Sequence, residues 1–158
     1  MQRVLSQSIT LFVESKRRST PVGFVQAYGL NLHEGWCYSL AYTSPEYRRG
    51  FGAEATAGLL EYLFSEFPLR KVYADVLEFD MDTIKPLLGA GFVEEGRFRE
   101  HVWHGEQYWD MYRFAIYREA WQKFQARGTF SFTRTLDPNA QPEDPDQIPQ
   151  SGALPEPA

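Results

Sequence analysis

Short apolar runs alternate with polar residues at the beginning of the chain. Three of them, Ile9 to Lys16, Val22 to Leu30 and Trp36 to Thr43, are separated by polar turns around Thr20 and His33. Runs of this length with turn residues between them are typical of strands that pair in sequence order. The pattern predicts an antiparallel meander of three strands.

The hydrophobic period changes between Ala53 and Phe67, where leucine and phenylalanine recur at helical spacing. Pro68 should end this helix. Arg70 to Glu78 alternates once more and predicts a fourth strand. A strand, a helix and a strand in this order indicate a parallel crossover inside a mostly antiparallel sheet.

A second, short helix is expected after the fourth strand. We expect Asp80 or Asp82 to cap it, and Gly89 and Gly91 to end it. Pro86 should kink this helix or confine it to its last turns.

The remaining ordered elements are two long strands and a helix. Phe92 to Trp103 and Glu106 to Tyr117 are strand-like and joined by a turn at His104 and Gly105, and Arg118 to Phe124 is helical. The predicted class is α+β, with a mixed sheet of the α/β type.

Composition divides the chain into a domain over residues 1–128 and an extension over residues 129–158. From residue 136 onward the extension is rich in proline and acidic residues and has few hydrophobic ones. Such a composition cannot bury a core, so we assign it no regular structure.

Charge and cysteine content narrow the function classes. The formal net charge is -5, which argues against nucleic acid as a partner. Cys37 is the only cysteine, so the chain holds no internal disulfide, and we expect it to pack as a small hydrophobic residue. There is no membrane-spanning apolar run and no signal peptide, so we expect a cytoplasmic protein.

The stretch SPEYRRGFGAEATAGLLEYLF, residues 44–64, joins two arginines and two glycines to a helix start. Free N–H groups and the helix dipole favour an anion there. Arg48 and Arg49 add charge, and Gly50 and Gly52 let a phosphate approach the backbone. The alternative is a tight turn with solvated arginines.

The succession of SPEYRRGFGAEA, VYADVLE and GAGFVEEGRFREHVWHGEQYWDMYRFAIYREAW resembles the GNAT superfamily of N-acetyltransferases. The resemblance covers Ile9 to Trp121. It is greatest to the branch that contains ribosomal-protein N-terminal, polyamine and small antibiotic-modifying acetyltransferases.

This resemblance implies an acyl-CoA N-acyltransferase fold that binds acetyl-CoA as co-substrate. The turn before the long helix would hold the pyrophosphate, and the third strand would bind the pantetheine through its backbone. A splay between the third and fourth strands would admit the pantetheine. The implied cofactor contacts are Leu40, Ala41, Tyr42, Thr43, Arg48, Arg49, Gly50, Phe51, Gly52, Ala53, Asp80, Thr83 and Leu87.

The chain departs from the family pattern at four positions. Tyr47 stands at the usual basic position of the turn, and Leu87 replaces a tyrosine that protonates the leaving thiolate in many members. Asp80 stands where an asparagine commonly touches the pantetheine. Thr83 stands where this branch often has a serine.

Thr83 and Glu78 are the candidate catalytic residues. Thr83 could donate a proton to the thiolate or could cap the short helix. Glu78 could accept the amine proton or could be an ordinary solvated carboxylate. Tyr42 could line the cleft, although a tyrosine on a central strand is usually core.

Three further polar positions have structural interpretations. His101 and His104 lack the Cys or carboxylate neighbours of a metal site, so we expect no metal. Asp110 should pair with Arg97 or Arg99 across the last two strands.

The family fold begins with one strand and two helices before the strand at Ile9, yet only eight residues precede Ile9. We therefore expect an N-terminally truncated fold whose first strand is an open edge, with Ile9, Leu11 and Val13 on one face. We expect a homodimer, or a partner subunit, to cover the gap; the alternative is that TFSFTRT, residues 129–135, folds back over it.

The expected activity is transfer of an acetyl group from acetyl-CoA to a primary amine on a protein N-terminus, a polyamine or a small molecule. The alternative is a non-catalytic CoA-binding or protein-interaction module, which the missing tyrosine and helices favour.

Overall fold

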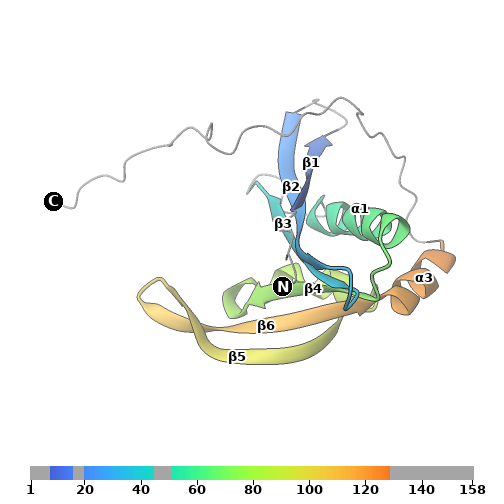
Figure 1. Ribbon diagram of the computed structural model, residues 1–158. Helices are drawn as coiled ribbons and strands as arrows, with labels where there is room; N and C mark the ends of the chain where they lie inside the picture. The colour runs from blue at the N-terminus through green and yellow to red at the C-terminus, as the bar shows by residue number, and fades with distance from the viewer. Residues whose placement is uncertain (1–7, 16–19, 45–50, 129–158) are drawn as a thin grey trace.

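Six strands form one mixed sheet in the order β1-β2-β3-β4-β6-β5 (Figure 1). The computed structural model describes residues 8–15, 20–44 and 51–128. The strands are β1 (Ile9–Ser15), β2 (Thr20–Asn31), β3 (Trp36–Thr43), β4 (Lys71–Leu77), β5 (Val93–His104) and β6 (Gln107–Tyr117). The helical elements are α1 (Phe51–Glu66), η2 (Glu78–Thr83, a 3₁₀-helix), α2 (Lys85–Leu88) and α3 (Arg118–Ala126). The expected fold class is confirmed.

The only parallel pair within the described part of the sheet is β3 with β4, which α1 connects. β1, β2 and β3 form an antiparallel meander, and β4, β6 and β5 form a second antiparallel group. The sheet therefore consists of two antiparallel groups of strands joined at β3 and β4.

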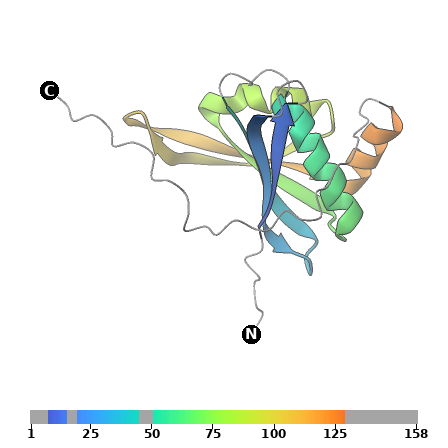
Figure 2. The ribbon, with the colours of Figure 1, turned by 90° about the horizontal axis from the view of Figure 1, so that it is seen from above.

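The core lies between one side of the sheet and the helices. Leu59, Leu60 and Leu63 of α1 are almost fully buried and pack with Cys37 of β3 and Val72 of β4. The predicted helical stripe is thereby confirmed, as is the buried packing of Cys37. Figures 1 and 2 both show α1 and α3 on this same side of the sheet.

The opposite side of the sheet is here called the open face, because no helix among the described residues covers it (Figure 2). Strand alternation sends Phe12 of β1 to this face. Ile9, Leu11 and Val13 point the other way and pack against the core. β1 is an edge strand, as expected, but its exposed apolar side chain is Phe12, which is 72% exposed.

The short helix expected after β4 is instead divided in two. η2 starts at Glu78, and α2 has Pro86 in its first turn. Pro86 has no N–H to donate to the carbonyl four residues earlier, so one continuous helix cannot cross this point. The predicted cap was wrong: neither Asp80 nor Asp82 caps a helix, and the N-caps are Leu77 and Ile84.

β5 and β6 form a long hairpin that projects from the body of the molecule (Figure 1). Its turn lies at Gly105 and Glu106, one residue later than expected, with φ of 60° and 68°. Two positive φ angles in a two-residue loop match the twist of the flanking strands.

Candidate active site

β3 and β4 separate at the end of their parallel ladder. The pairing runs from Trp36 and Lys71 to Ser39 and Ala74, where it stops. β3 then continues to Thr43 beside β2, while β4 continues to Leu77 beside β6. The carboxyl ends of two parallel strands therefore lie on either side of a fork, which is the splay expected from the resemblance.

Backbone groups of β3 point into this fork. The Ser44 N–H donates to the Val22 carbonyl over 2.9 Å, so the even-numbered residues before it also face β2. Ala41 and Thr43 consequently direct their N–H and C=O groups toward β4, where the sheet gives them no partner strand. The Ser39 hydroxyl donates to the Tyr73 carbonyl over 2.9 Å at the last paired rung.

The N-terminus of α1 lies next to the end of β3. A Cβ added to Gly52 would lie 4.0 Å from Cγ2 of Thr43, so the first turn of α1 adjoins the fork. The free N–H groups of this turn, which includes Ala53 and the backbone of Phe51, are suited to an anion. Arg48, Arg49 and Gly50 lie outside the described residues.

η2 follows the fork on the β4 side and carries the candidate catalytic residues. Glu78 is exposed. The pKa of the Arg97 guanidinium is raised mainly by Asp110, and the charge of Glu78 makes a smaller contribution in the same direction. The Thr83 hydroxyl donates to the Asp80 carbonyl over 2.7 Å, a bond within η2 and not the helix cap considered above. Their catalytic roles stay predictions.

Leu87 is partly buried and packs against the core. It lines a small cavity with Ala57 of α1, Pro86, and Trp121 and Phe124 of α3. An isobutyl group cannot donate a proton, so Leu87 cannot perform the proton donation that the resemblance assigns to a tyrosine at this position.

Tyr42 lies on the open face at the fork and is 52% exposed. The interpretation of Tyr42 as core was therefore wrong. β3 is central in the sheet, but burial requires cover on both faces, and no described helix lies over this one. The Tyr42 ring packs against Phe24, with centroids 5.5 Å apart.

Two ion pairs on the open face were missed at the sequence level. Arg113 of β6 donates two hydrogen bonds of 2.7 Å to Asp75 of β4, and its guanidinium lies over the Tyr38 ring. Lys71 donates to Glu95 over 2.7 Å. The alternation of Lys71 and Asp75 with apolar residues predicted strand β4. It could not indicate that these two side chains pair with residues of β5 and β6.

Burial and pairing act in opposite directions on Lys71 and Glu95. Burial, the largest single effect, would lower the pKa of Lys71, but hydrogen bonding and charge interactions with Glu95 and Tyr73 together outweigh it and the pKa is raised. Burial would likewise raise the pKa of Glu95, yet hydrogen bonds from Lys71 and Tyr117 lower it. Both groups are held in their charged forms.

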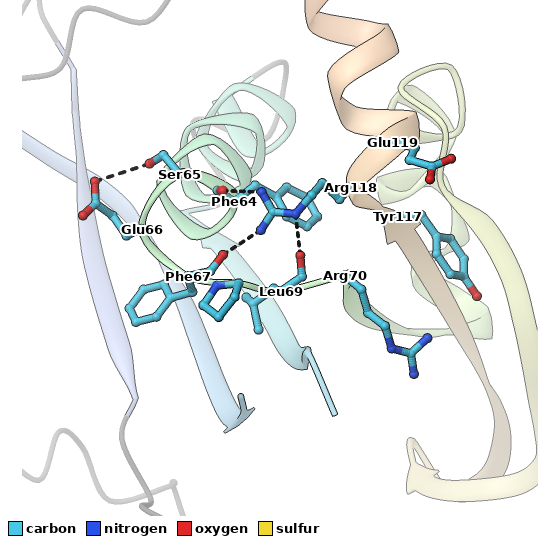
Figure 3. Close-up of a pocket in the computed structure, with 10 residues that line it drawn as sticks. Phe64, Ser65, Glu66, Phe67, Leu69, Arg70, Tyr117, Arg118 and Glu119 are labelled. Carbon is cyan, nitrogen blue, oxygen red and sulfur yellow. Dashed lines mark hydrogen bonds between the residues drawn. The ribbon is translucent and has the colours of Figure 1, made fainter. Parts of the chain in front are cut away.

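A hollow of about 770 Å³ lies at the amino end of β4, the opposite end of that strand from the fork (Figure 3). Figure 3 shows the Arg118 guanidinium at its centre, donating to the carbonyls of Phe64, Phe67 and Leu69 over 2.6–2.7 Å. Arg118 thus ties the end of α1 to the start of α3, and we assign the hollow no catalytic role.

No group of three His, Cys, Asp or Glu side chains in the described ranges could hold a metal ion. The His104 ring stacks on Phe79, and His101 packs against Phe98. Burial raises the pKa of the Cys37 thiol to about 12. None of the helices described is both long and apolar enough to cross a bilayer; a cytoplasmic location stays a prediction.

Solved structures of acetyltransferases share the fold of this chain. A spermidine N-acetyltransferase from Vibrio cholerae in complex with CoA and spermine superposes with a TM-score of 0.68 over 73% of this chain and 68% of that one, at 23% identity. The chain has the GNAT acetyltransferase fold. A second Vibrio cholerae structure, spermidine/spermine N-acetyltransferase SpeG in complex with manganese ions, matches this GNAT fold with a TM-score of 0.66 at 24% identity, over 76% and 69% of the two chains.

Two curated relatives come from Bacillus subtilis (strain 168). The uncharacterized N-acetyltransferase YnaD is 28% identical over 62% of this chain and 56% of its own length. The SPbeta prophage-derived uncharacterized N-acetyltransferase YokL is 26% identical over 70% and 63%. The chain thus spans about three-fifths of the length of these relatives. No family model matches the chain.

Proposed function

We propose that the chain transfers an acetyl group from acetyl-CoA to a primary amine. The observation that carries this proposal is the fork between β3 and β4, with the N-terminus of α1 beside it. A fork with unpaired backbone groups suits the amides of a pantetheine arm, and a helix N-terminus suits a diphosphate. The CoA-bound spermidine N-acetyltransferase with the same fold supports the assignment.

The cofactor contacts follow from this placement. Leu40, Ala41, Tyr42 and Thr43 would line the pantetheine side of the fork, with the N–H and C=O groups of Ala41 and Thr43 facing it. Residues 48–53 would hold the diphosphate, and Asp80, Thr83 and Leu87 would adjoin the thioester end.

The proposed chemistry is direct attack without a covalent enzyme intermediate. The neutral amine nitrogen forms a bond to the thioester carbonyl carbon, and the carbon–sulfur bond breaks. Glu78, directly or through water, accepts the proton that the amine loses. The thiolate of CoA takes up a proton from water, either directly or relayed through the Thr83 hydroxyl, which gives one proton to sulfur and regains one from water. Orientation in the fork supplies much of the acceleration.

Thr83 must change its hydrogen bond to take this role. Its hydroxyl has one proton, which it donates to the Asp80 carbonyl. Rotation about one side-chain bond frees that proton for the sulfur, and the carbonyl is then left to water. The cost is small at an exposed position.

The acceptor class is a primary amine of a polyamine, a protein N-terminus or a small molecule. A polyamine is supported by the solved relative with CoA and spermine. The acidic residues of η2, which include Glu78, Asp80 and Asp82, are of the sign that would attract a polycation.

Two observations favour a non-catalytic CoA-binding module instead. Leu87 offers no proton, and the Thr83 hydroxyl is bonded within η2. Such a module would bind CoA at the same fork and turn over no acceptor.

The deciding experiment follows release of free thiol from acetyl-CoA with spermidine, a peptide with a free N-terminus and an amino sugar as acceptors. Acceptor-dependent thiol release supports the enzyme. Binding of CoA by calorimetry without thiol release supports the module, and absence of both results contradicts the fork as a CoA site.

A further inference from the structure

The open face of β1, β2 and β3 carries an uncharged aromatic patch. Strand alternation and the registers of β1 with β2 and of β2 with β3 place nine described side chains together on it. They are Thr10, Phe12, Phe24, Gln26, Tyr28, Trp36, Tyr38, Leu40 and Tyr42. None of these nine is charged; the one charged side chain that the alternation places on the same face of the described parts of β1, β2 and β3 is the exposed Glu14, two residues after Phe12 at the end of β1.

The exposed apolar area of this patch is of the size that an interface core requires. Phe12, Tyr42, Leu40 and Tyr28 are 72%, 52%, 45% and 38% exposed. At about 200 Å² for a whole side chain, they expose about 400 Å². Each partner in a standard interface buries about 800 Å², of which somewhat more than half is apolar. The patch therefore supplies most of the apolar core, and its rim would supply the rest.

The rings of the patch are already held in place. Tyr28 stacks on Tyr38 with centroids 5.4 Å apart, and Phe24 packs against Tyr42 at 5.5 Å. Side chains fixed in this way lose little rotamer freedom on association. Depletion of charge together with rigid aromatic anchors is the composition of a protein interface core.

The charges around the patch indicate which partner fits. Arg113 is paired with Asp75, and Lys71 with Glu95, so both ion pairs beside the patch are closed within the chain. The remaining charged side chain on this face of the described parts of the three strands is Glu14, at the end of β1. A copy of this chain, with a net charge of -5, would be repelled by acidic surface elsewhere but not at an uncharged patch.

We propose that two copies of this chain pack open face to open face about a two-fold axis. The patch then meets itself, as an isologous interface requires. Two sheets stacked about 10 Å apart would interdigitate these aromatic side chains. The proposal does not depend on acetyl transfer; if the chain is an enzyme, the partner copy also forms a wall beside Tyr42 at the fork.

The first test is sedimentation velocity of the full chain at micromolar concentrations. The expected species is a dimer. Phe12→Glu and Tyr28→Glu each place a carboxylate in the patch, opposite a second one in the partner, and should weaken dimerisation by about 100-fold. Leu32→Glu, at an equally exposed apolar position in the β2–β3 turn, is the matched control and should remain dimeric.

Circular dichroism of each variant checks that it is folded. A wild-type monomer over this concentration range would overturn the proposal. The proposal would also be overturned if the protein forms a dimer or a larger assembly and folded Phe12→Glu dissociates with the same dissociation constant as folded Leu32→Glu.

The second test measures cover of the patch without a disruptive charge. Cys37 is the only native cysteine and is fully buried, so Thr10→Cys gives one reactive thiol on the open face. Its rate of maleimide labelling should fall as protein concentration rises, whereas that of Leu32→Cys should not. Labelling that is fast at every concentration contradicts the dimer. Labelling that is slow at every concentration in a monomer indicates cover from within the chain, such as by residues 129–158, and also contradicts it.

Discussion

Asp110 shows how one buried carboxylate organises the β5–β6 hairpin. It accepts hydrogen bonds from the Glu100 N–H over 2.7 Å and from Arg97 Nε over 2.6 Å. The expected pairing with Arg97 is thereby confirmed. Glu100 has φ of 49°, a left-handed conformation inside a bulge where three residues of β5 lie opposite one residue of β6. The carboxylate therefore fixes both the bulge and the direction of the hairpin.

The same contacts make the hairpin sensitive to acid. The Glu100 N–H, followed by the Arg97 guanidinium, lowers the pKa of Asp110 below its ordinary value of about 3.9. Its contribution to stability is thus complete above that value and is lost as the pH falls through the lower, folded pKa. Wild type should exceed Asp110→Asn in urea stability at neutral pH, and the difference should shrink below about pH 4. Glu119→Gln, at an exposed helix position, is the control; a pH-independent difference would contradict the prediction.

Thr83→Ala tests the proposed proton donor. If Thr83 protonates the thiolate, turnover should fall by more than the KM for acetyl-CoA rises, because the interaction is made mainly in the transition state. Steady-state kinetics with a saturating acceptor measure both quantities. Thr83→Ser keeps a hydroxyl and should retain turnover. If Thr83→Ala turns over as fast as wild type, Thr83 is not the proton donor and its role is the hydrogen bond to the Asp80 carbonyl.

Replacing Arg48 and Arg49 together by Ala tests the diphosphate site. Charge-assisted hydrogen bonds contribute about 1.5–3 kcal/mol each, so CoA affinity should fall by at least tenfold. Isothermal calorimetry measures the affinity. Arg127→Ala, exposed at the end of α3, is the matched control; an unchanged affinity in the double variant would move the diphosphate elsewhere.

At the scale of elements, α1 depends on a residue outside itself. Its last turn contains no basic residue, yet the carbonyls at its end need donors. Arg118 supplies them from the first position of α3, and its guanidinium also lies over the Phe64 ring at 5.1 Å. One side chain thus joins α1, the following loop and the end of β6.

Arg118→Met should lower the free energy of unfolding by about 1.5–3 kcal/mol, since the lost hydrogen bonds have a charged donor. Arg118→Lys should recover only part of this, because one ammonium cannot reach three carbonyls in the planar geometry of a guanidinium. Urea denaturation measures the difference, with Lys123→Met as the control. Equal stability of Arg118→Met and wild type would show that water satisfies these carbonyls.

The elements that follow one simple period could be predicted from the sequence. β3 and the stripe of α1 came from alternation and from helical spacing, because each buries one face. An interruption at Pro86 was also predicted, but the 3₁₀ conformation of η2 before it was not. The pair of Arg113 and Asp75 was also beyond the sequence, because it depends on the register of two strands 38 residues apart along the chain.

At the scale of the whole molecule, the domain boundary after residue 128 is open to test. If residues 129–158 add nothing to the core, a chain ending at Gly128 should unfold cooperatively with nearly the same midpoint. A loss of 1 kcal/mol would shift the midpoint by about 2–6 °C in a protein of this size, which calorimetry resolves. A truncated chain that loses cooperative unfolding would show that the extension belongs to the domain.

The fork between β3 and β4 also has a consequence for how the chain folds. The β1–β3 meander and the β5–β6 hairpin contain mainly contacts between residues close in sequence, which form early because little chain entropy is lost. The parallel rungs from Trp36 and Lys71 to Ser39 and Ala74 require α1 to be closed between them, and the β4–β6 pairs close a stretch of chain at least as long, so both pairings should form after the local ones. We therefore expect the ladder that bounds the candidate active site, which has only four rungs, to be a seam at which the folded molecule opens readily, with slow amide exchange fading toward it.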